Sequence, residues 1–147
     1  MMSMAPNVLT PAGFHRYEVA SYAREGFECK HNIAYWTGVP YLGLGISAVT
    51  MTQNDARRMR VQDGEVQDDL DRKQMCAEDL MMKMRMTRGV SDDELFAAAV
   101  VIPGALDVFN SLVRDKLVKR EDGRWKPTFG GWLLGNELYG RIYELAP

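Results

Sequence analysis

The residues best suited to chemistry lie close together, between positions 28 and 51. The segment HNIAYW, residues 31–36, places an imidazole, an amide and two aromatic rings side by side in the chain. A neutral imidazole is a good axial ligand for haem iron, and rings such as those of Tyr35 and Trp36 can form an apolar wall beside a flat ligand. The residue types alone also fit a more common arrangement, in which His31 only hydrogen-bonds to backbone at the base of a loop.

Cys29 precedes this histidine by two residues. A thiolate there can act as a second soft ligand or as a redox group. An inert, buried side chain is the more common role of an isolated cysteine, and we predict that role for Cys29 and for Cys76. The second histidine, His15, carries no motif, and we assign it no function.

A glycine-punctuated apolar stretch follows, with the sequence YLGLGISAVTM over residues 41–51. Its alternating pattern predicts a strand over 39–51, in which Gly43 and Gly45 allow another group to approach the backbone closely. A phosphate-binding loop is not supported, because no GK[ST] sequence follows. The remaining alternatives are the wall of a ligand site and an edge strand packed against its neighbours.

HNIAYW followed by PYLGLGISA resembles the HNxxYW and YLGxGxxA signature of the oxygen-independent coproporphyrinogen III oxidase-like radical SAM family. The preceding GFHRYEVASYAREGFEC fits the same family, and HNxxYW is typical of its haem-chaperone (HemW) branch. The resemblance implies that His31 is a ligand of haem iron. It further implies that the cofactor-binding residues are His31, Asn32, Tyr35, Trp36, Gly43, Gly45 and Val49, the last three lining the S-adenosylmethionine pocket with Val49 against the adenine.

Full-length members of this family carry an N-terminal CxxxCxxC motif, whose thiolates hold a four-iron four-sulfur cluster. The present chain contains two cysteines, Cys29 and Cys76, and cannot assemble such a cluster alone. The resemblance therefore implies a C-terminal portion that is inactive by itself in radical chemistry. Its expected partners are haem or a porphyrin and the missing N-terminal half of the barrel or another copy of the chain; S-adenosylmethionine and the cluster are expected in a full-length parent only.

The composition is that of an ordinary globular protein: 147 residues, 46% apolar and 26% charged. A net charge of −2 offers no general basic surface to nucleic acid or to anionic lipid. The sequence shows neither a secretory signal pattern nor an apolar run long enough to span a bilayer, and its unpaired cysteines fit a reducing compartment. We therefore expect a cytoplasmic location, with no membrane span and no nucleic acid partner.

The predicted fold is α+β and mostly helical, with three parts. Residues 1–52 are expected to be the end of a partial (β/α) barrel, residues 53–70 a linker or exposed hairpin, and residues 71–147 a helical, winged-helix-like domain. Local signals define the third part. They are a Met-rich helix over 70–86 that stops at Gly89, a capping box at Ser91 and Glu94, a break at 102–104, a helix over 105–115, a hairpin turn at 121–124 and a last helix over 128–145.

Two further functions remain open. In the first, the parent protein is a coproporphyrinogen III oxidase rather than a chaperone. In the second, the chain is a winged-helix interaction or DNA-binding module without a cofactor. DNA binding is disfavoured, because the expected recognition helix over 105–117 offers only Arg114 and Lys116 as cations. Arg57, Arg58 and Arg60 have the chemistry to bind a haem propionate, but acidic neighbours favour a solvated face instead.

Overall fold

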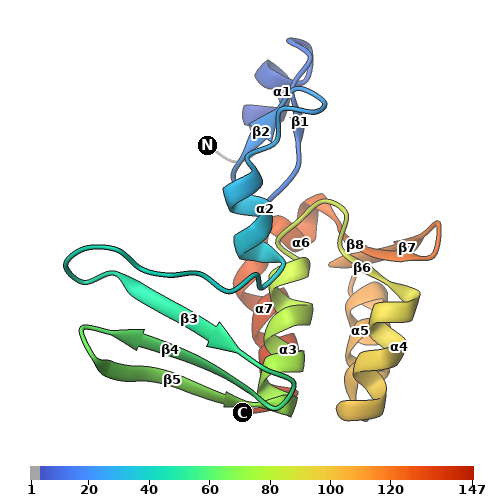
Figure 1. Cartoon of the computed structure of the whole chain (residues 1–147). Helices are drawn as coiled ribbons and strands as arrows, with labels where there is room; N and C mark the ends of the chain where they lie inside the picture. Colours follow the sequence, from blue (N-terminus) through green and yellow to red (C-terminus); the bar gives the residue numbers. More distant parts are fainter. Residues whose placement is uncertain (1–3) are drawn as a thin grey trace.

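The computed structural model describes residues 4–147, so the first three residues of the part expected over 1–52 lie outside it. The second half of the chain forms a helical unit with a small sheet (Figure 1). Helices α3 and α7 lie side by side, and α4 and α5 form a second pair beside them. The helices are α3 (Arg72–Lys83), α4 (Asp92–Val101), α5 (Ala105–Arg114), α6 (Phe129–Leu133) and α7 (Gly135–Tyr143). The antiparallel strands β6 (Val90–Ser91), β7 (Val118–Glu121) and β8 (Arg124–Pro127) pair in the order β6-β8-β7.

The local signals of this unit are confirmed. Ser91 Oγ accepts from the Glu94 amide at 3.2 Å, while the Glu94 carboxylate accepts from the Ser91 amide at 2.7 Å, which completes the capping box of α4. Asp122 and Gly123 both have positive φ, 51° and 69°, as a two-residue hairpin turn of this kind requires. The prediction of a single last helix is wrong, because Leu134 leaves the helical conformation and divides this segment into α6 and α7.

The apolar core lies within this unit. Phe109, Leu112 and Leu138 are fully buried, and the Phe109 ring meets Trp125 edge-on with its centroid at 5.8 Å. The methionines of the first helix and its end contribute to the interior, since Met82, Met84 and Met86 are buried. The core role is therefore confirmed for this Met-rich segment, although α3 itself ends at Lys83.

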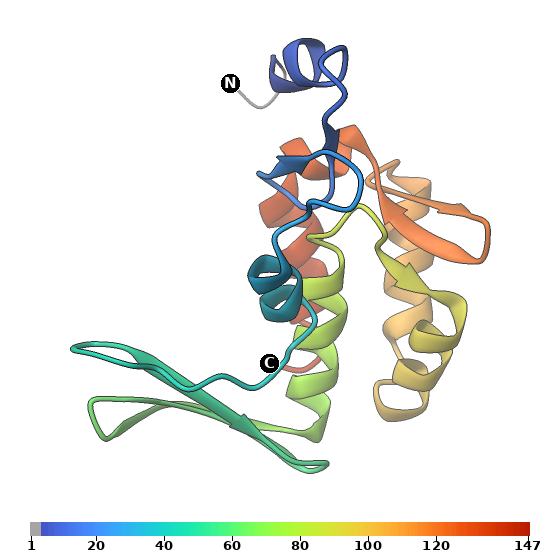
Figure 2. The ribbon, with the colours of Figure 1, turned by 45° about the horizontal axis from the view of Figure 1, so that its top comes forward.

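The first part of the chain is made of short elements above α3 and α7 (Figure 2). They are α1 (Ala5–Leu9), β1 (His15–Arg16), β2 (Tyr22–Ala23) and α2 (Lys30–Trp36), with β1 and β2 paired antiparallel. A turn joins these two short strands. Glu18 in this turn is buried and forms an isolated bridge with Met86, so the turn is attached to the end of α3.

A three-stranded antiparallel sheet projects to one side of α3 (Figures 1 and 2). Its strands are β3 (Val49–Gln53), β4 (Arg57–Gln62) and β5 (Glu65–Asp71), in the order β3-β4-β5. The segment expected as a linker or exposed hairpin forms the hairpin, with Asp63 and Gly64 at positive φ in its turn. The strand expected over 39–51 is much shorter, because positive φ at Gly45 and Ser47 keeps the preceding residues out of a strand.

The α+β class is thus confirmed. Within the part of the chain that the structure describes, no helix is both long enough and apolar enough to cross a membrane.

Candidate functional site

The HNIAYW segment lies on α2, which packs against α3. The sequence predicts no helix here, because its N-terminus lacks the usual signals. Cys29 occupies the N-cap position without a side-chain hydrogen bond to the helix, and no acidic residue lies in the first turn. The helix ends at Thr37, and Gly38 follows at a φ of 72°. Contact with the rest of the molecule, rather than local capping, holds this helix in place.

The motif divides into two pairs, each with the four-residue spacing that places side chains on one helix face. Asn32 and Trp36 are half-buried and attach the helix to its surroundings. Asn32 Nδ2 donates to Tyr17 Oη at 3.2 Å, and the Arg85 guanidinium lies 5.2 Å from the Trp36 ring centroid. His31 and Tyr35 are exposed instead. One pair is therefore structural, and the other faces outward.

The His31 side chain makes no hydrogen bond or ion pair with any residue that the structure describes. His15 differs, because its Nε2 lies 2.8 Å from Glu28 Oε1. The interpretation of His31 as a histidine bonded to backbone is therefore wrong. Of the two imidazoles, that of His31 has both nitrogens available to a ligand.

An aromatic ring, that of Tyr35, belongs to the same helix face as this imidazole. The Tyr35 ring meets Trp36 edge-on at 5.1 Å and lies 6.0 Å from the Tyr41 ring, both measured between centroids. Tyr35 is 44% exposed, so part of its ring remains available for contact. We call His31, Tyr35 and Tyr41 the α2 surface. It combines a nitrogen ligand with aromatic area, which suits the binding of a flat metal complex.

Gly43, Gly45 and Val49 are not brought to the α2 surface, because their loop projects away from α2 toward the far end of the sheet (Figure 1). A Cβ at Gly43 would lie 2.5 Å from the Val49 carbonyl oxygen, so this glycine allows the chain to fold closely onto its own β3. The Gly43 amide donates to Thr50 Oγ1 at 3.1 Å in the same contact. Gly45 has a φ of 105°, which also favours glycine. Their role beside S-adenosylmethionine stays a prediction.

Two of the three arginines of β4 do not form a solvated face, whereas Arg57 does, since its side chain is 61% exposed. Arg58 is 1% exposed and its guanidinium binds Glu78 at 2.5 Å and Asp79 at 2.7 Å, both on α3. Arg60 also binds Glu78, at 2.9 Å. Burial alone would raise the pKa of Glu78, but hydrogen bonds from Arg60 and Arg58 outweigh it and lower the pKa below its usual value. These arginines therefore attach the sheet to α3, and their guanidinium groups are already engaged by carboxylates.

The two cysteines differ. Cys29 is exposed, so the prediction that it is buried is wrong; its position at the edge of α2 leaves the thiol outside the core. Cys76 is half-buried against the core, where burial raises the pKa of its thiol. Among residues 4–147, no group of three or more His, Cys, Asp or Glu side chains is placed to hold a metal ion.

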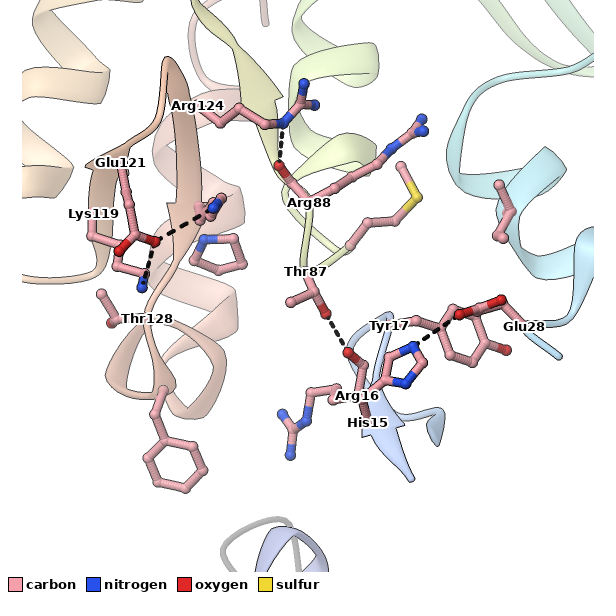
Figure 3. A pocket seen from close by; sticks show the side chains of 15 residues that line it. His15, Arg16, Tyr17, Glu28, Thr87, Arg88, Lys119, Glu121, Arg124 and Thr128 are labelled. Atoms are coloured by element: carbon pink, nitrogen blue, oxygen red, sulfur yellow. Dashed lines mark hydrogen bonds and ion pairs between the residues drawn. The ribbon is translucent and has the colours of Figure 1, made fainter. Parts of the chain in front are cut away.

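A large cleft separates β1 from the β7–β8 hairpin (Figure 3). Its volume is about 940 Å³, and apolar side chains such as Ile33, Met86 and Phe129 line it together with several cations. Thr87 Oγ1 donates to the Arg16 carbonyl at 2.8 Å across its base. Sequence reasoning missed this cleft, because its walls come from segments far apart in the chain. His31 is not among its lining residues.

Comparisons with known proteins show which proteins this chain resembles. No family model matches the chain. It is 54% identical over 43 residues to Heme chaperone HemW of Synechocystis sp. (strain ATCC 27184 / PCC 6803 / Kazusa), which covers 29% of this chain and 10% of the relative. It is 28% identical over 149 aligned positions to Heme chaperone HemW of Bacillus subtilis (strain 168), which covers 87% of this chain and 38% of the relative. Among solved structures, the radical SAM enzyme coproporphyrinogen III oxidase (HemN) from Escherichia coli matches 95% of this chain and 39% of its own, with a TM-score of 0.60 and 17% identity.

The fold is therefore one found in oxygen-independent coproporphyrinogen III oxidase-like radical SAM proteins. Within that class, the chain resembles the C-terminal portion of the HemW branch, as its motif predicts. The chain spans 38% or less of the length of the two HemW relatives described above.

Proposed function

We propose that this chain takes part in haem binding and delivery as the C-terminal part of a HemW-like protein, with His31 as a ligand of the haem iron. The observation that carries the proposal is the free, exposed imidazole of His31 on the same helix face as Tyr35. The relatives named Heme chaperone HemW support it. Haem or a related porphyrin is the proposed cargo.

Each motif residue then has a distinct task. His31 supplies the nitrogen ligand, and the rings of Tyr35 and Tyr41 offer aromatic contact to the flat face of the cargo. Asn32 and Trp36 hold α2 through Tyr17 and Arg85, so that the ligand is presented on a fixed helix. This division gives the exposed pair a chemical role and the half-buried pair a structural one.

In a longer parent protein, we propose that a barrel carries the iron–sulfur cluster and S-adenosylmethionine, with Gly43, Gly45 and Val49 beside the latter. The exposed loop before β3 fits such a neighbour, because Leu42, Leu44 and Ile46 are 74%, 84% and 98% exposed. The barrel of such a parent, or a second copy of the chain, is the proposed cover. The division into parts 1–52, 53–70 and 71–147 belongs to the same proposal.

A haemin titration tests the haem proposal. Wild-type protein is expected to bind one haemin with a shift of the Soret band, and His31→Ala to lose that shift. His15→Ala is the matched control, because His15 is held by Glu28 and should leave the titration unchanged. Gel filtration of each complex excludes aggregates. Equal binding by wild type and His31→Ala would contradict the role of His31.

The oxidase alternative is supported by the fold likeness to HemN. It predicts a different result: a full-length parent would decarboxylate coproporphyrinogen III, and His31→Ala would matter less for that activity than for haem binding. Assay of the parent with this substrate distinguishes the two roles.

We also propose that the unit from α3 to β8 is a winged-helix-type interaction domain. The element order α3, β6, α4, α5, β7, β8 and the strand order β6-β8-β7 support this architecture. DNA binding is not favoured, because the cations of the β7–β8 hairpin already lie near carboxylates. The pairs are Lys119 with Glu121, Arg120 with Asp92, Arg124 with Glu94 and Lys126 with Glu121. Binding to DNA that survives His31→Ala would instead favour the DNA-binding alternative.

A further inference from the structure

The cleft between β1 and the β7–β8 hairpin, of about 940 Å³, has no role in the function proposed above. The hairpin turns one face toward it (Figure 3). Lys119 lies opposite Lys126 in the strand pairing, two residues before Glu121 lies opposite Arg124, so these four side chains share that face. Trp125 points to the other face and is 3% exposed within the core. The core therefore fixes which charges the hairpin offers to the cleft.

Cations outnumber carboxylates in the lining of this cleft. The cations are Arg16, Arg88, Lys119, Arg124 and Lys126, and the carboxylates are those of Glu28 and Glu121. Two further carboxylates approach hairpin cations from outside the lining: Glu94 lies 3.7 Å from Arg124, and Asp122 lies 4.0 Å from Lys126. Arg88 has no ion pair with any residue that the structure describes. A positive excess remains, and its small size suits a short acidic segment better than the continuous phosphate chain of a nucleic acid.

The cleft also has the anatomy of a protein–protein interface. Ile33 and the buried Met86 supply apolar surface, and the ring of Phe129 is half exposed. The hairpin cations are partly solvated, as the 54% exposed side chain of Lys119 illustrates. An apolar centre with a charged, partly solvated rim is typical of protein interfaces, in which aromatic side chains often act as anchors. The cations come from β1, from the segment after α3 and from the hairpin, so they do not converge on one point as a site for a single small anion requires.

We propose that this cleft binds an extended acidic segment of a partner protein. Its carboxylates would pair with the cations of the lining, and an apolar side chain would pack against Ile33, Met86 and Phe129. Side chains on one face of an extended chain repeat every two residues, roughly 7 Å apart, which is also the repeat of the charged pairs along the hairpin. The proposal does not depend on haem binding, because neither His31 nor Tyr35 lines the cleft.

A labelled peptide tests the proposal. A fluorescein-labelled peptide in which Asp and Glu alternate with Leu is titrated with the whole chain and followed by fluorescence anisotropy. We expect saturable binding that weakens as the salt concentration rises, and no binding of the same peptide with Asn and Gln in place of the acids. Citrate and phosphatidylglycerol vesicles are added as competitors. Displacement by citrate at equal carboxylate concentration would identify a small-anion site, and preferential binding of the vesicles a lipid site; either result would overturn the proposal.

The double variant Arg88→Gln/Lys119→Gln locates the binding site. Both side chains are exposed, so the fold should remain intact, and the peptide affinity is expected to fall about fivefold or more. Lys73→Gln/Arg114→Gln is the matched control, because it changes the net charge equally at exposed positions outside the cleft. The control should leave the affinity within about twofold of the wild type. Equal losses in the two double variants would mean that net charge alone attracts the peptide, and the cleft would not be the site.

Phe129→Ala tests the apolar part of the same site. Phe129 is 50% exposed at the cleft, and its loss is expected to weaken peptide binding about fivefold or more. Phe96→Ala is the control, since Phe96 is 48% exposed on α4 and does not line the cleft. An unchanged affinity in Phe129→Ala would overturn the assignment of the apolar contact, and the absence of any saturable binding by the wild type would overturn the proposal as a whole.

Discussion

The region before α3 and the unit from α3 to the C-terminus are stabilised by different interactions. The helical unit has a continuous apolar core that includes Phe109, Leu112 and Leu138. Among the described residues before α3, only Ala23 and Met51 are buried apolar side chains. Polar and aromatic contacts attach this first region instead, among them Arg85 over Trp36 and Arg58 on Glu78. The candidate ligand surface therefore lies in the less densely packed region.

This contrast explains how a small helix can present His31. A seven-residue helix without a side-chain cap is unstable alone. Trp36 and Asn32 attach it to groups that the core unit and the N-terminal turn hold in place, so the stability of α2 depends on the rest of the molecule. Regions of low local stability are also those that open most easily for ligands or partners. We therefore expect changes in the core to affect the whole chain, and changes before α3 to act locally.

Loss of a core side chain should have the largest effect. Phe109→Ala removes a fully buried ring that packs against Trp125, and is expected to reduce the free energy of unfolding by about 3–5 kcal/mol. Phe27→Ala is the matched control in the first region, since Phe27 is 82% exposed, and should change stability by less than about 0.5 kcal/mol. Urea unfolding followed by circular dichroism measures both. Similar losses in the two variants would remove the distinction between the regions.

The same contrast determines what the sequence could predict. In the helical unit, the signals are local: Ser91 and Glu94 cap α4, and Asp122 and Gly123 form the hairpin turn, all within a few residues. In the first region, the decisive contacts are distant in sequence. Arg58 finds its carboxylates twenty residues later on α3, so a charged segment that reads as solvated becomes the buried centre of a sheet–helix contact.

The candidate site shows the same limit. The motif identified His31 and its aromatic neighbours, but not the helix that separates His31 and Tyr35 from Asn32 and Trp36, because α2 lacks capping signals. No sequence pattern could find the cleft between β1 and the β7–β8 hairpin, because its walls come from segments far apart in the chain.

Two glycine substitutions, one in each region, compare the regions through stability losses of intermediate size. Gly89 has a φ of 59°, and an added Cβ would meet the backbone of Trp125 in the core unit. Gly89→Ala would place a side chain on a left-handed backbone and press it against core backbone that cannot easily move. It should reduce the free energy of unfolding by about 2–4 kcal/mol. Gly43→Ala would also meet backbone, at the Val49 carbonyl oxygen of β3, but the loop that carries Gly43 lies outside the core and can move, so its cost should be smaller, about 1–2 kcal/mol. Thermal unfolding of both variants measures the difference, and equal costs would mean that the loop is as rigid as the core.

The smallest expected effect concerns the attachment of the sheet. Arg58→Leu removes the guanidinium that joins β4 to Glu78 and Asp79, while Arg60 still compensates Glu78. We expect a loss of about 1.5–3 kcal/mol, read as faster hydrogen exchange in β3, β4 and β5 with little change in α5. Arg57→Leu is the control, because its pair with Asp69 is exposed and contributes at most about 1 kcal/mol. Uniformly faster exchange that includes α5 would show that the sheet and the core unfold as one unit.

Acidification should release the same contact without a mutation. The arginines lower the pKa of Glu78 below its ordinary value of 4.5, so its contribution to stability is complete above that value and is lost as the pH falls through the lower, folded pKa. Hydrogen exchange in the sheet is therefore expected to accelerate, relative to α5, as the pH falls below about 4.5. Arg58→Leu, which has already lost part of the contact, should show a shallower dependence than the wild type. The same dependence in both proteins would assign the acid sensitivity to other carboxylates, and Arg58 would then hold the sheet by packing rather than by charge.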